Sequence, residues 1–439
     1  MKVSPFVRKL ILVFGDICCI YFANSLAIMP ILGSSEYKFN FEFLSILILL
    51  MFFMFNVYGL FSLVRKRLTD IFLNLLVAIL NIYIICIAIT YLINELDYSS
   101  MTILISAILS FVLLGVWQYV CHKWEWNNFP KHHGVLFAKD NEKKILENKL
   151  SKTYGLENVL QDVSHGLNDN LWQKKIDENY YVFIGSSLDI KEKEAILCYA
   201  RSKKKQIFLV PTLYELACKN TGLLLVDDVP MQRVTRLLLT DEQRTLKRCI
   251  DIIIAILSII LLLPIMILTA IIIKVSSKGP IIYSQERVGL YGKTFFVHKF
   301  RSMKQDAEAK CGPILAAEDD NRITKFGRFI RATRLDELPQ LFNVLKGEMS
   351  IVGPRPERPF FVEKFVAQKP EYDYRHNVKP GITGLAQIAG KYNTNAYDKL
   401  IYDLLYIQDV GVKTDLMIML QTFKVLLTKS STEGVQNSK

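Results

Sequence analysis

Four long runs of apolar residues open the chain, separated by short polar segments. They cover roughly residues 10–32, 41–63, 71–93 and 101–121. Each run has about 20 residues, the length an α-helix needs to cross a hydrocarbon core about 30 Å thick. The first run is too long for a signal peptide and lacks a small-residue cleavage pattern, so we interpret it as a span. The pattern predicts a membrane α-helical bundle of four transmembrane helices over residues 1–125.

The charged residues between these runs predict the orientation of the bundle. Lysine and arginine cluster before the first run, between the second and third, and after the fourth, whereas the other two loops together hold one lysine. Basic loops tend to stay in the cytoplasm, so both ends of the bundle are predicted to face it. Asp16 lies inside the first run, near its basic end. A charge at membrane depth is a candidate for function, and an interfacial or helix-pairing role is the plainer interpretation.

Residues 130–240 have a different pattern, in which short apolar runs alternate with charged, helix-like ones. The strand-like runs are 134–140, 180–186, 206–212 and 222–229. The alternation predicts a parallel sheet with crossover helices, a Rossmann-like α/β domain. A dinucleotide site would require the sequence GxGxxG directly after the first strand. The chain has LFAKDNEKK there, without a glycine, so this domain is expected to be structural or regulatory.

A fifth apolar run begins near residue 249 and is long enough to cross a membrane, but basic residues flank both of its ends. A full crossing would leave one basic flank outside, against the positive-inside tendency. Pro264 lies in the middle of the run, where it removes a backbone hydrogen bond and clashes with the preceding turn. These features favour a re-entrant membrane helix over residues 250–273 that turns at Pro264 and leaves on the cytoplasmic side. An ordinary span with a proline kink is the alternative.

The amino-acid composition of the chain indicates which kinds of molecule it is suited to bind. The 439-residue chain is 51% hydrophobic and carries a formal charge of +12. A basic surface suits anionic lipid, phosphorylated substrates or nucleic acid. The eight cysteines include no CxxC pair, so neither a zinc site nor a disulfide framework is expected.

Cationic side chains in the last third of the chain are candidates for binding phosphate. In an extended VHKFR segment, Lys299 and Arg301 project to the same face, because strands alternate with period two. A solvated strand face is the alternative. Arg355 lies between two prolines, which restrict the backbone to extended conformations. Such an arginine can bind a phosphate with two parallel hydrogen bonds. A stiff turn on the protein surface is an equally good interpretation of this motif.

The stretch RLDELPQLFN places two carboxylates side by side. Pro339 is tolerated only in the first turn of a helix, so a helix is predicted to begin close to Asp336 and to end at Gly347. The positive end of the helix dipole and nearby arginines such as Arg331 would favour the anionic form of Asp336. That carboxylate could attack phosphorus or serve only as an N-cap. Glu337 points elsewhere and could hold Mg²⁺, which prefers oxygen ligands.

These features together suggest phosphoryl transfer at the membrane surface to a lipid-borne acceptor. The glycine-rich loop HNVKPGITGLAQIAG would let the backbone approach a ligand closely. The segments KFRSM, TKFGRFIRATRLDELPQLFNVLKGEMSIVGPRP and KPGITGLAQIAG resemble the bacterial sugar transferases called monotopic phosphoglycosyl transferases. The similarity covers about residues 246–427. The four spans and the Rossmann-like middle match the large subgroup, the undecaprenyl-phosphate hexose-1-phosphate transferases.

The resemblance implies a mixed α/β monotopic catalytic domain at residues 244–428, followed by a disordered tail at 429–439. It implies that Asp336 attacks the sugar-bearing phosphate of a UDP-sugar, that UMP leaves, and that the sugar phosphate passes to undecaprenyl phosphate. Glu337 would be linked to the required Mg²⁺, and Pro264 would break the re-entrant helix. The residues implied to hold the substrate phosphates are Arg331, Arg355, Lys299 and Arg301. Leu263 stands where some relatives have serine, so the break should depend more on the proline.

The predicted protein is a multi-pass protein of the bacterial inner, or cytoplasmic, membrane, with both soluble domains in the cytoplasm. Its predicted partners are a UDP-sugar, undecaprenyl phosphate and the lipid bilayer, and no nucleic acid. It would carry out the first membrane step of capsule, exopolysaccharide or O-antigen synthesis. The few polar residues in the spans argue against a transporter, and the intact acid, arginine and proline set argues against an inactive scaffold. The sugar, the polymer, the ligand of the middle domain, a homodimer and polysaccharide-assembly partners are left open.

Overall fold

The computed structural model divides the chain into two compact units, Met1–Thr212 and Leu213–Lys439. The residues described are 5–28, 41–61, 66–92, 100–128, 133–151, 160–164, 171–217, 223–226, 229–232, 237–276, 279–303, 322–390 and 396–426. The tail expected at 429–439 lies outside the described residues.

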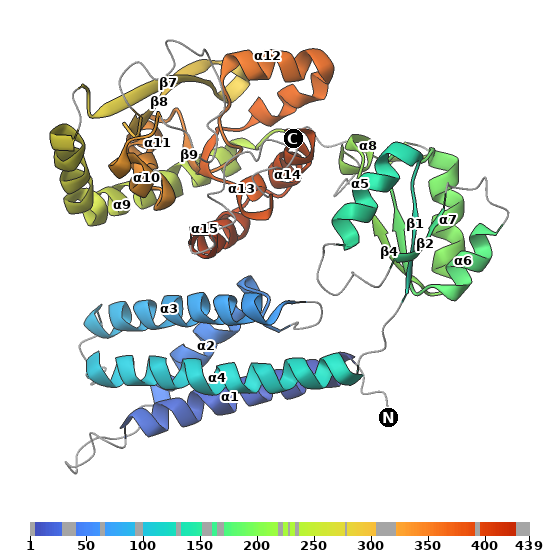
Figure 1. Ribbon diagram of the computed structural model, residues 1–439, viewed down its shortest axis with the longest axis horizontal. Helices are drawn as coiled ribbons and strands as arrows, with labels where there is room; N and C mark the ends of the chain where they lie inside the picture. Colours follow the sequence, from blue (N-terminus) through green and yellow to red (C-terminus); the bar gives the residue numbers. More distant parts are fainter. Residues whose placement is uncertain are drawn as a thin grey trace. The chain divides into compact units, whose positions relative to one another are not determined.

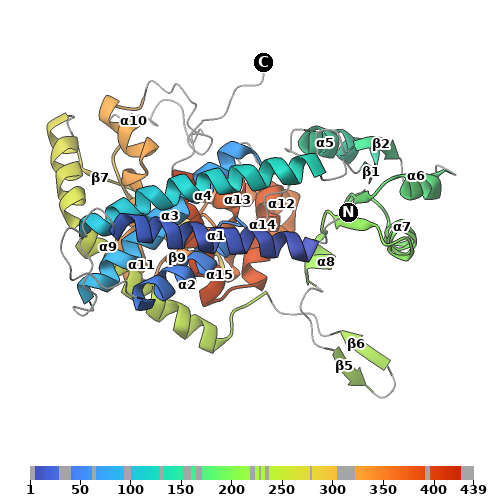
Figure 2. The same cartoon turned by 90° about the horizontal axis from the view of Figure 1, so that it is seen from below.

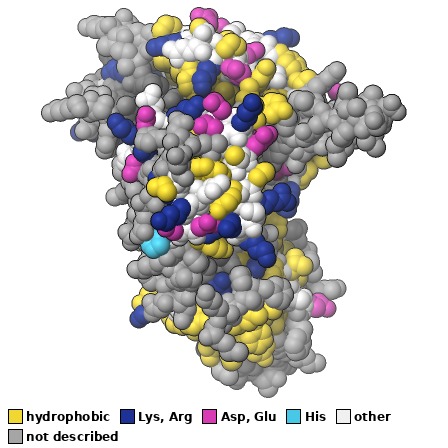
Figure 3. Space-filling model, turned by 90° about the vertical axis from the view of Figure 1, so that its right-hand side faces the viewer, with side chains coloured by type: hydrophobic (Ala, Val, Ile, Leu, Met, Phe, Trp, Pro, Cys, Tyr) yellow, Lys and Arg dark blue, Asp and Glu magenta, His cyan; other side chains and the backbone are white. Residues whose placement is uncertain are grey.

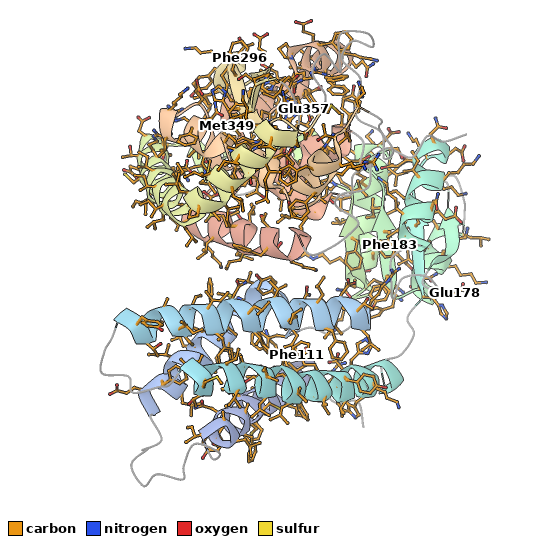
Figure 4. The ribbon with its side chains drawn as sticks, turned by 60° about the vertical axis from the view of Figure 1, so that its left-hand side comes forward. Phe111, Glu178, Phe183, Phe296, Met349 and Glu357 are labelled. Carbon is orange, nitrogen blue, oxygen red and sulfur yellow. The ribbon has the colours of Figure 1, made fainter. Side chains whose placement is uncertain are left out.

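The first unit opens with the four helices that the apolar runs predict. They are α1 (Pro5–Ile28), α2 (Phe41–Val57), α3 (Leu68–Leu92) and α4 (Ser100–Asn128). The helix α4 packs against both α1 and α3, and their side chains meet near the labelled Phe111 (Figure 4). By length and hydropathy α1, α3 and α4 could each cross a membrane, whereas the described part of α2 is shorter, at 17 residues. Hydrophobic side chains gather over this bundle on the face drawn in Figure 3, so the chain is a membrane protein.

Polar contacts inside the bundle join helices that are far apart in the sequence. Gln118 of α4 donates to Asp16 of α1 at 3.4 Å, which supports the helix-pairing role for this acid. The hydroxyl of Tyr83 lies 2.8 Å from that of Ser106 and 2.7 Å from that of Ser110. A buried polar group costs free energy unless it is hydrogen-bonded, and the hydroxyls of Tyr83, Ser106 and Ser110 meet that requirement between neighbouring helices.

A small α/β region completes the first unit. Its elements are β1 (Gly134–Phe137), α5 (Asp140–Ser151), β2 (Leu160–Ser164), α6 (Trp172–Glu178), β3 (Tyr181–Ile184), α7 (Ile190–Ser202) and β4 (Gln206–Leu209). The four strands are parallel in the order β2-β1-β3-β4. One sheet face packs on α6 and α7 through Ile176 and Ile196, and the other packs on α5 through Leu146. Figure 1 shows these helices on opposite sides of the sheet, as burial of both faces of a parallel sheet requires.

The second unit holds the remaining elements. They are α8 (Leu213–Ala217), β5 (Leu223–Val226), β6 (Val229–Gln232), α9 (Asp241–Ser276), β7 (Ile282–Val288), η3 (Leu290–Gly292), β8 (Thr294–Phe300), α10 (Lys325–Ala332), η4 (Leu335–Glu337), α11 (Gln340–Lys346), β9 (Ser350–Val352), α12 (Pro359–Gln368), η5 (Pro370–Asn377), β10 (Gly381–Thr383), α13 (Leu385–Ala389), α14 (Ala396–Gln408) and α15 (Val412–Leu426). The run at 222–229 does form a strand, but β5 pairs antiparallel with β6 in a separate hairpin. It therefore does not extend the parallel sheet.

The long helix α9 carries the fifth apolar run. It is continuous over 36 residues and contains Pro264. Figures 1 and 2 both show its ribbon changing direction, from a lime segment to a yellow one, and the missing hydrogen bond of an internal proline accounts for such a bend. Its outward side chains are apolar, with Leu261 77% and Val275 84% exposed. Apolar surface on that scale suits lipid rather than water.

Two polar side chains tie the first part of α9 to the core of its unit. Arg248 donates to the carbonyls of Val344 and Leu345 at the end of α11, at 2.6 and 2.7 Å. The carboxylate of Asp251 accepts from the backbone N–H of Ile351 in β9 at 3.0 Å. Because these groups are bonded to the backbone of α11 and β9, the start of α9 is fixed to the soluble fold.

The second part of α9 makes an apolar contact instead. Met266 and Ile273 are buried in a cluster with side chains from β8 and α10. Leu335 and Leu338 pack against the same cluster. These two leucines flank the paired carboxylates of the LDEL sequence, so the segment of α9 after Pro264 supports the turn that carries them.

The glycines of the KPGITG loop lie close to another stretch of the chain. A Cβ atom on Gly381 would lie 2.0 Å from the backbone nitrogen of Gly353, and one on Gly384 would lie 2.2 Å from the carbonyl oxygen of Gly353. Such distances are impossible for a side chain. The loop therefore uses its glycines to let two stretches of the chain approach each other, and not only a ligand as the sequence suggested.

Candidate active site

The paired carboxylates, Asp336 and Glu337, lie on a tight turn. Arg334 precedes them in the left-handed conformation, with φ 59°, and both carboxylates belong to the 3₁₀ turn η4. The expected helix begins later than predicted, at Gln340 of α11, because residues Leu335–Glu337 form a separate 3₁₀ turn and Pro339 is the N-cap. The predicted stop is confirmed, since Gly347 ends α11 with φ 88°.

Glu337 is surrounded by cations. Its Oε1 atom accepts from Lys299 of β8 and from Arg355, both at 2.9 Å, and it lies 3.9 Å from Arg334. Burial alone would raise the pKa of Glu337, but Arg355, Lys299 and Arg334 more than offset this and hold its pKa well below the usual range. Burial in turn lowers the pKa of Lys299, against the opposing effect of Glu337. Glu337 is therefore the anionic centre that gathers these cations.

Asp336 has a contrasting environment. The residue is 8% exposed, and its Oδ1 atom has no hydrogen-bond partner among the residues that the structure describes. Burial and the charge of Glu337 raise the pKa of Asp336 to about 6, although Lys299, Arg331 and Arg334 act to lower it. The helix dipole was expected to favour the anion, but a 3₁₀ turn precedes the helix here and burial has the larger effect. A carboxyl with this pKa is still roughly nine-tenths ionised at pH 7.

The other cations predicted from the sequence fall into two groups. Arg331, on α10, acts on the charge of Asp336. Arg301 follows β8 and its side chain is buried, but within the described chain the contacts of Asp336 and Glu337 do not include it. Lys299 therefore reaches the paired carboxylates, and a phosphate-binding role for Arg301 stays a prediction.

The paired carboxylates are also candidate ligands for Mg²⁺. No group of three or more His, Cys, Asp or Glu side chains that could hold a metal occurs in the described segments. Mg²⁺ is, however, usually held by one or two carboxylates together with substrate phosphate oxygens and water. Asp336 has an oxygen without a partner, and Glu337 lies next to it. The pair therefore fits a magnesium ion that substrate helps to hold.

Three residues near Arg355 were missed by sequence reasoning. Its Nη1 atom donates to the side-chain oxygen of Gln387 at 3.5 Å. The carbonyl of Arg355 accepts from Arg375 at 2.9 Å, and Arg287 donates to the next carbonyl at 3.0 Å. These residues come from α13, η5 and β7, and no local pattern of the sequence would have joined them.

A buried pair of carboxylates ringed by lysine and arginine, on a unit with an apolar outward-facing helix, defines a site for phosphate chemistry at a membrane. Comparison with known proteins agrees with that class. The family model described as bacterial sugar transferase matches residues 242–429.

Curated relatives carry specific names. The UDP-N-acetylgalactosamine-undecaprenyl-phosphate N-acetylgalactosaminephosphotransferase of Aeromonas hydrophila is 41% identical over 211 residues, which cover 47% of this chain and 50% of the relative. The UDP-glucose:undecaprenyl-phosphate glucose-1-phosphate transferase of Klebsiella pneumoniae is 36% identical over 295 residues, covering 66% and 63%. A protein with the same name from Caulobacter vibrioides is 40% identical over 189 residues, covering 42% and 70%.

This chain belongs to the bacterial sugar transferase family. The family predicted from the sequence motifs is thereby confirmed. The chain spans about half to under two thirds of the length of the first two relatives, at 50% and 63%. The relatives differ in the sugar that they are named for.

Proposed function

We propose that this protein transfers a hexose-1-phosphate from a UDP-sugar to undecaprenyl phosphate and releases UMP. The reaction would be the first membrane step of capsule, exopolysaccharide or O-antigen synthesis. The observation that carries the proposal is the open Oδ1 atom of Asp336, beside a glutamate that holds Lys299 and Arg355 in place. The activities named for the relatives are of this type.

The chemistry proceeds through a covalent aspartyl phosphate on Asp336. Its carboxylate oxygen attacks the phosphorus that bears the sugar, and the bond from that phosphorus to the UMP oxygen breaks. An oxygen of undecaprenyl phosphate then attacks the same phosphorus, and the bond to Asp336 breaks, which restores the carboxylate. Lys299, Arg331 and Arg355 offset the charge on the phosphate oxygens, and Arg301 is retained as a further phosphate-binding candidate.

Magnesium is the proposed cofactor. Asp336 and Glu337 would hold it together with substrate oxygens. When bound, it would offset charge on the transferred phosphate. Glu337 also anchors Lys299 and Arg355, so its role includes setting the positions of these cations.

We propose a re-entrant course for α9, with both soluble domains in the cytoplasm and the chain in the inner, or cytoplasmic, membrane. The bend at Pro264 and the basic residues at both ends of the helix support it. Single cysteines placed near Lys247 and near Lys278 should be labelled from the same side of sealed vesicles. Labelling from opposite sides would establish an ordinary kinked span.

The α/β region is proposed to be a Rossmann-like domain with a structural or regulatory role. The alternating elements support the fold, and the absence of glycine after β1, at Ala138–Asp140, supports the lack of a tight dinucleotide site. Glucose and N-acetylgalactosamine are both named among the relatives, so the sugar is left to experiment.

The decisive test uses the full chain, Mg²⁺ and a panel of UDP-sugars without a lipid acceptor. A covalent mechanism predicts release of up to one equivalent of UMP per site, with a sugar phosphate retained on Asp336 and mapped by mass spectrometry. Adding undecaprenyl phosphate should discharge the adduct and allow turnover. UMP release only in the presence of the lipid, with no trapped adduct, would instead support direct transfer, with Asp336 as a base or metal ligand.

A further inference from the structure

The segment that carries Arg355 cannot be held by regular secondary structure. Pro354 and Pro356 have no backbone N–H, so this stretch cannot form a complete ladder of hydrogen bonds. Its four consecutive carbonyls are nevertheless all hydrogen-bonded, to three other parts of the chain. The bonds run to Pro354 from the Gly381 N–H at 2.9 Å, to Arg355 from Arg375 at 2.9 Å, to Pro356 from Arg287 at 3.0 Å, and to Glu357 from the Val288 N–H at 2.9 Å.

Two of these four donors are arginine side chains, and Arg375 is the more completely fixed of the two. It is 5% exposed. Its guanidinium forms an ion pair with Asp403 of α14 at 2.9 Å and donates to the hydroxyl of Tyr372. Asp403 is itself 2% exposed and pairs with nothing else among the described contacts except Arg375. Arg375 therefore connects α14 and η5 to the backbone of the segment that carries the active-site arginine.

We propose that Arg375 is a positioning residue that holds Arg355 on Glu337, and that Arg287 supports the same segment one carbonyl further on. Arg375 itself does not touch the paired carboxylates in the described structure. Its catalytic consequence rests on the function proposed above, whereas its effect on the position of Arg355 does not depend on that function.

The geometry of the contact explains why an arginine stands at this position. A guanidinium is a rigid plane with five N–H donors, so it can bond a carboxylate, a hydroxyl and a carbonyl at once. A lysine could keep the charge beside Asp403, but its single ammonium group cannot span the same three acceptors with fixed directions. Arg375→Lys therefore removes the bridge while it retains the buried charge pair.

The first test measures the segment directly. Hydrogen exchange of the full chain in nanodiscs, followed by mass spectrometry, should show faster exchange in peptides covering residues 351–358 for Arg375→Lys. Arg248→Lys is the matched control, because Arg248 also donates to two backbone carbonyls, those at the end of α11. The control should leave exchange at 351–358 unchanged. Equal exchange at 351–358 in the wild-type protein and Arg375→Lys would overturn the proposal.

The second test asks whether Arg375 acts through Arg355. Arg375→Lys should lower kcat/KM for UMP release by about 10²-fold, the scale expected for a displacement of about 1 Å at an active site. Arg355→Lys is expected to lower it by about ten- to 150-fold. In the double variant the loss should stay close to the larger single loss, because the residues act as one unit. If the two losses multiply, Arg375 does not act through Arg355.

Further outcomes separate this proposal from the proposed function. If Arg375→Lys does not fold, Tyr372→Phe keeps every charge, removes one bond from Arg375, and should show a few-fold loss with the same non-additivity. Fully multiplied losses in that cycle would also overturn the proposal. If the wild-type protein releases no UMP from any UDP-sugar, the proposed function fails, and the exchange experiment alone decides the positioning role.

Discussion

Two carboxylates, Glu142 in the first unit and Asp336 in the second, have opposite surroundings. Glu142 of α5 lies at the carboxyl ends of β1 and β3, the sheet edge at which doubly wound folds bind ligands. It accepts from the backbone N–H of Ser186 at 2.9 Å, from the hydroxyl of Ser186 at 2.6 Å and from the backbone N–H of Ser187 at 2.7 Å. A Cβ on Gly185 would lie 2.6 Å from this carboxylate. Burial alone would raise the pKa of Glu142, but these donors more than offset it and lower the pKa.

Asp336 has the reverse arrangement. One of its oxygens has no partner among the described residues, and burial raises its pKa. The nearby cations Lys299 and Arg355 form their ion pairs with the neighbouring Glu337. The oxygens of Glu142 accept hydrogen bonds from neutral donors, so this carboxylate makes a closed structural contact. Asp336 keeps an oxygen for chemistry. A buried carboxylate is a candidate nucleophile when cations lie near it and one of its oxygens accepts no hydrogen bond.

The largest expected difference between the two sites is in catalysis. Asp336→Asn keeps the shape of the side chain but removes the nucleophile, so turnover should fall by about 10⁴-fold or more, to background. The measurement is steady-state UMP release with undecaprenyl phosphate present. Circular dichroism and melting of the variant should match the wild-type protein. Turnover within tenfold of the wild-type rate would remove Asp336 from the nucleophile role.

Glu337→Gln should have the second largest effect. It removes the anchor of Lys299 and Arg355 and one oxygen donor for the proposed metal, so UMP release should fall by about 10²-fold. A series of Mg²⁺ concentrations would separate the two carboxylates, because added Mg²⁺ should restore part of the Glu337→Gln loss and none of the Asp336→Asn loss. The same metal response in both variants would contradict the separate roles.

The pH dependence of the UMP burst should come next in size. Burial and the charge of Glu337 raise the pKa of Asp336 to about 6. The ionised form reacts, so activity should be present above pH 6, fall as the pH drops through 6, and reach about one tenth of its plateau at pH 5. In Glu337→Gln the midpoint should move to lower pH, since a neighbouring negative charge has been removed. A wild-type midpoint near pH 4 would show that Asp336 is not perturbed.

The smallest effect on catalysis is expected at Glu142. Glu142→Gln replaces an acceptor with an amide that cannot accept at both positions, which should cost about 1 kcal/mol of the free energy of unfolding of the α/β region. UMP release per folded molecule should be unchanged. Local exchange of residues 185–187 should increase in the variant. A tenfold loss of turnover would mean that this contact is coupled to the catalytic unit.

Strong periodic patterns made much of the fold predictable. The four apolar runs correspond to α1 to α4, and the alternation of apolar and charged runs predicted β1, β3 and α7. The strand β2 (Leu160–Ser164) and the helix α6 were missed, because the segment LQDVS alternates weakly and WQKKIDE is short and polar. Their formation depends on pairing with β1 and on packing of Ile176 in the core.

The chemistry of the site was predictable where neighbours in the sequence are neighbours in space. Asp336, Glu337 and Arg331 lie within one stretch, and the family motif joined them to Lys299 and Arg355. Arg375 could not be placed, because its contact with Arg355 depends on how η5 and α14 fold back. The raised pKa of Asp336 was missed for the same reason, since burial is a property of the packed chain.

The leucines on either side of the paired carboxylates rest on the same apolar cluster as Met266 and Ile273 of α9. In the re-entrant course proposed for α9, this one helix would set the height of the reacting oxygen above the hydrocarbon. For an acceptor confined to the membrane, encounters at that height occur by lateral diffusion in two dimensions. The rate then follows the mole fraction of acceptor in the leaflet, and diluting it with other lipid slows the reaction even when the total amount is constant. The proposed UDP-sugar donor is water-soluble and would arrive from three dimensions. The rate would therefore depend on the bulk concentration of the donor but on the surface density of the acceptor.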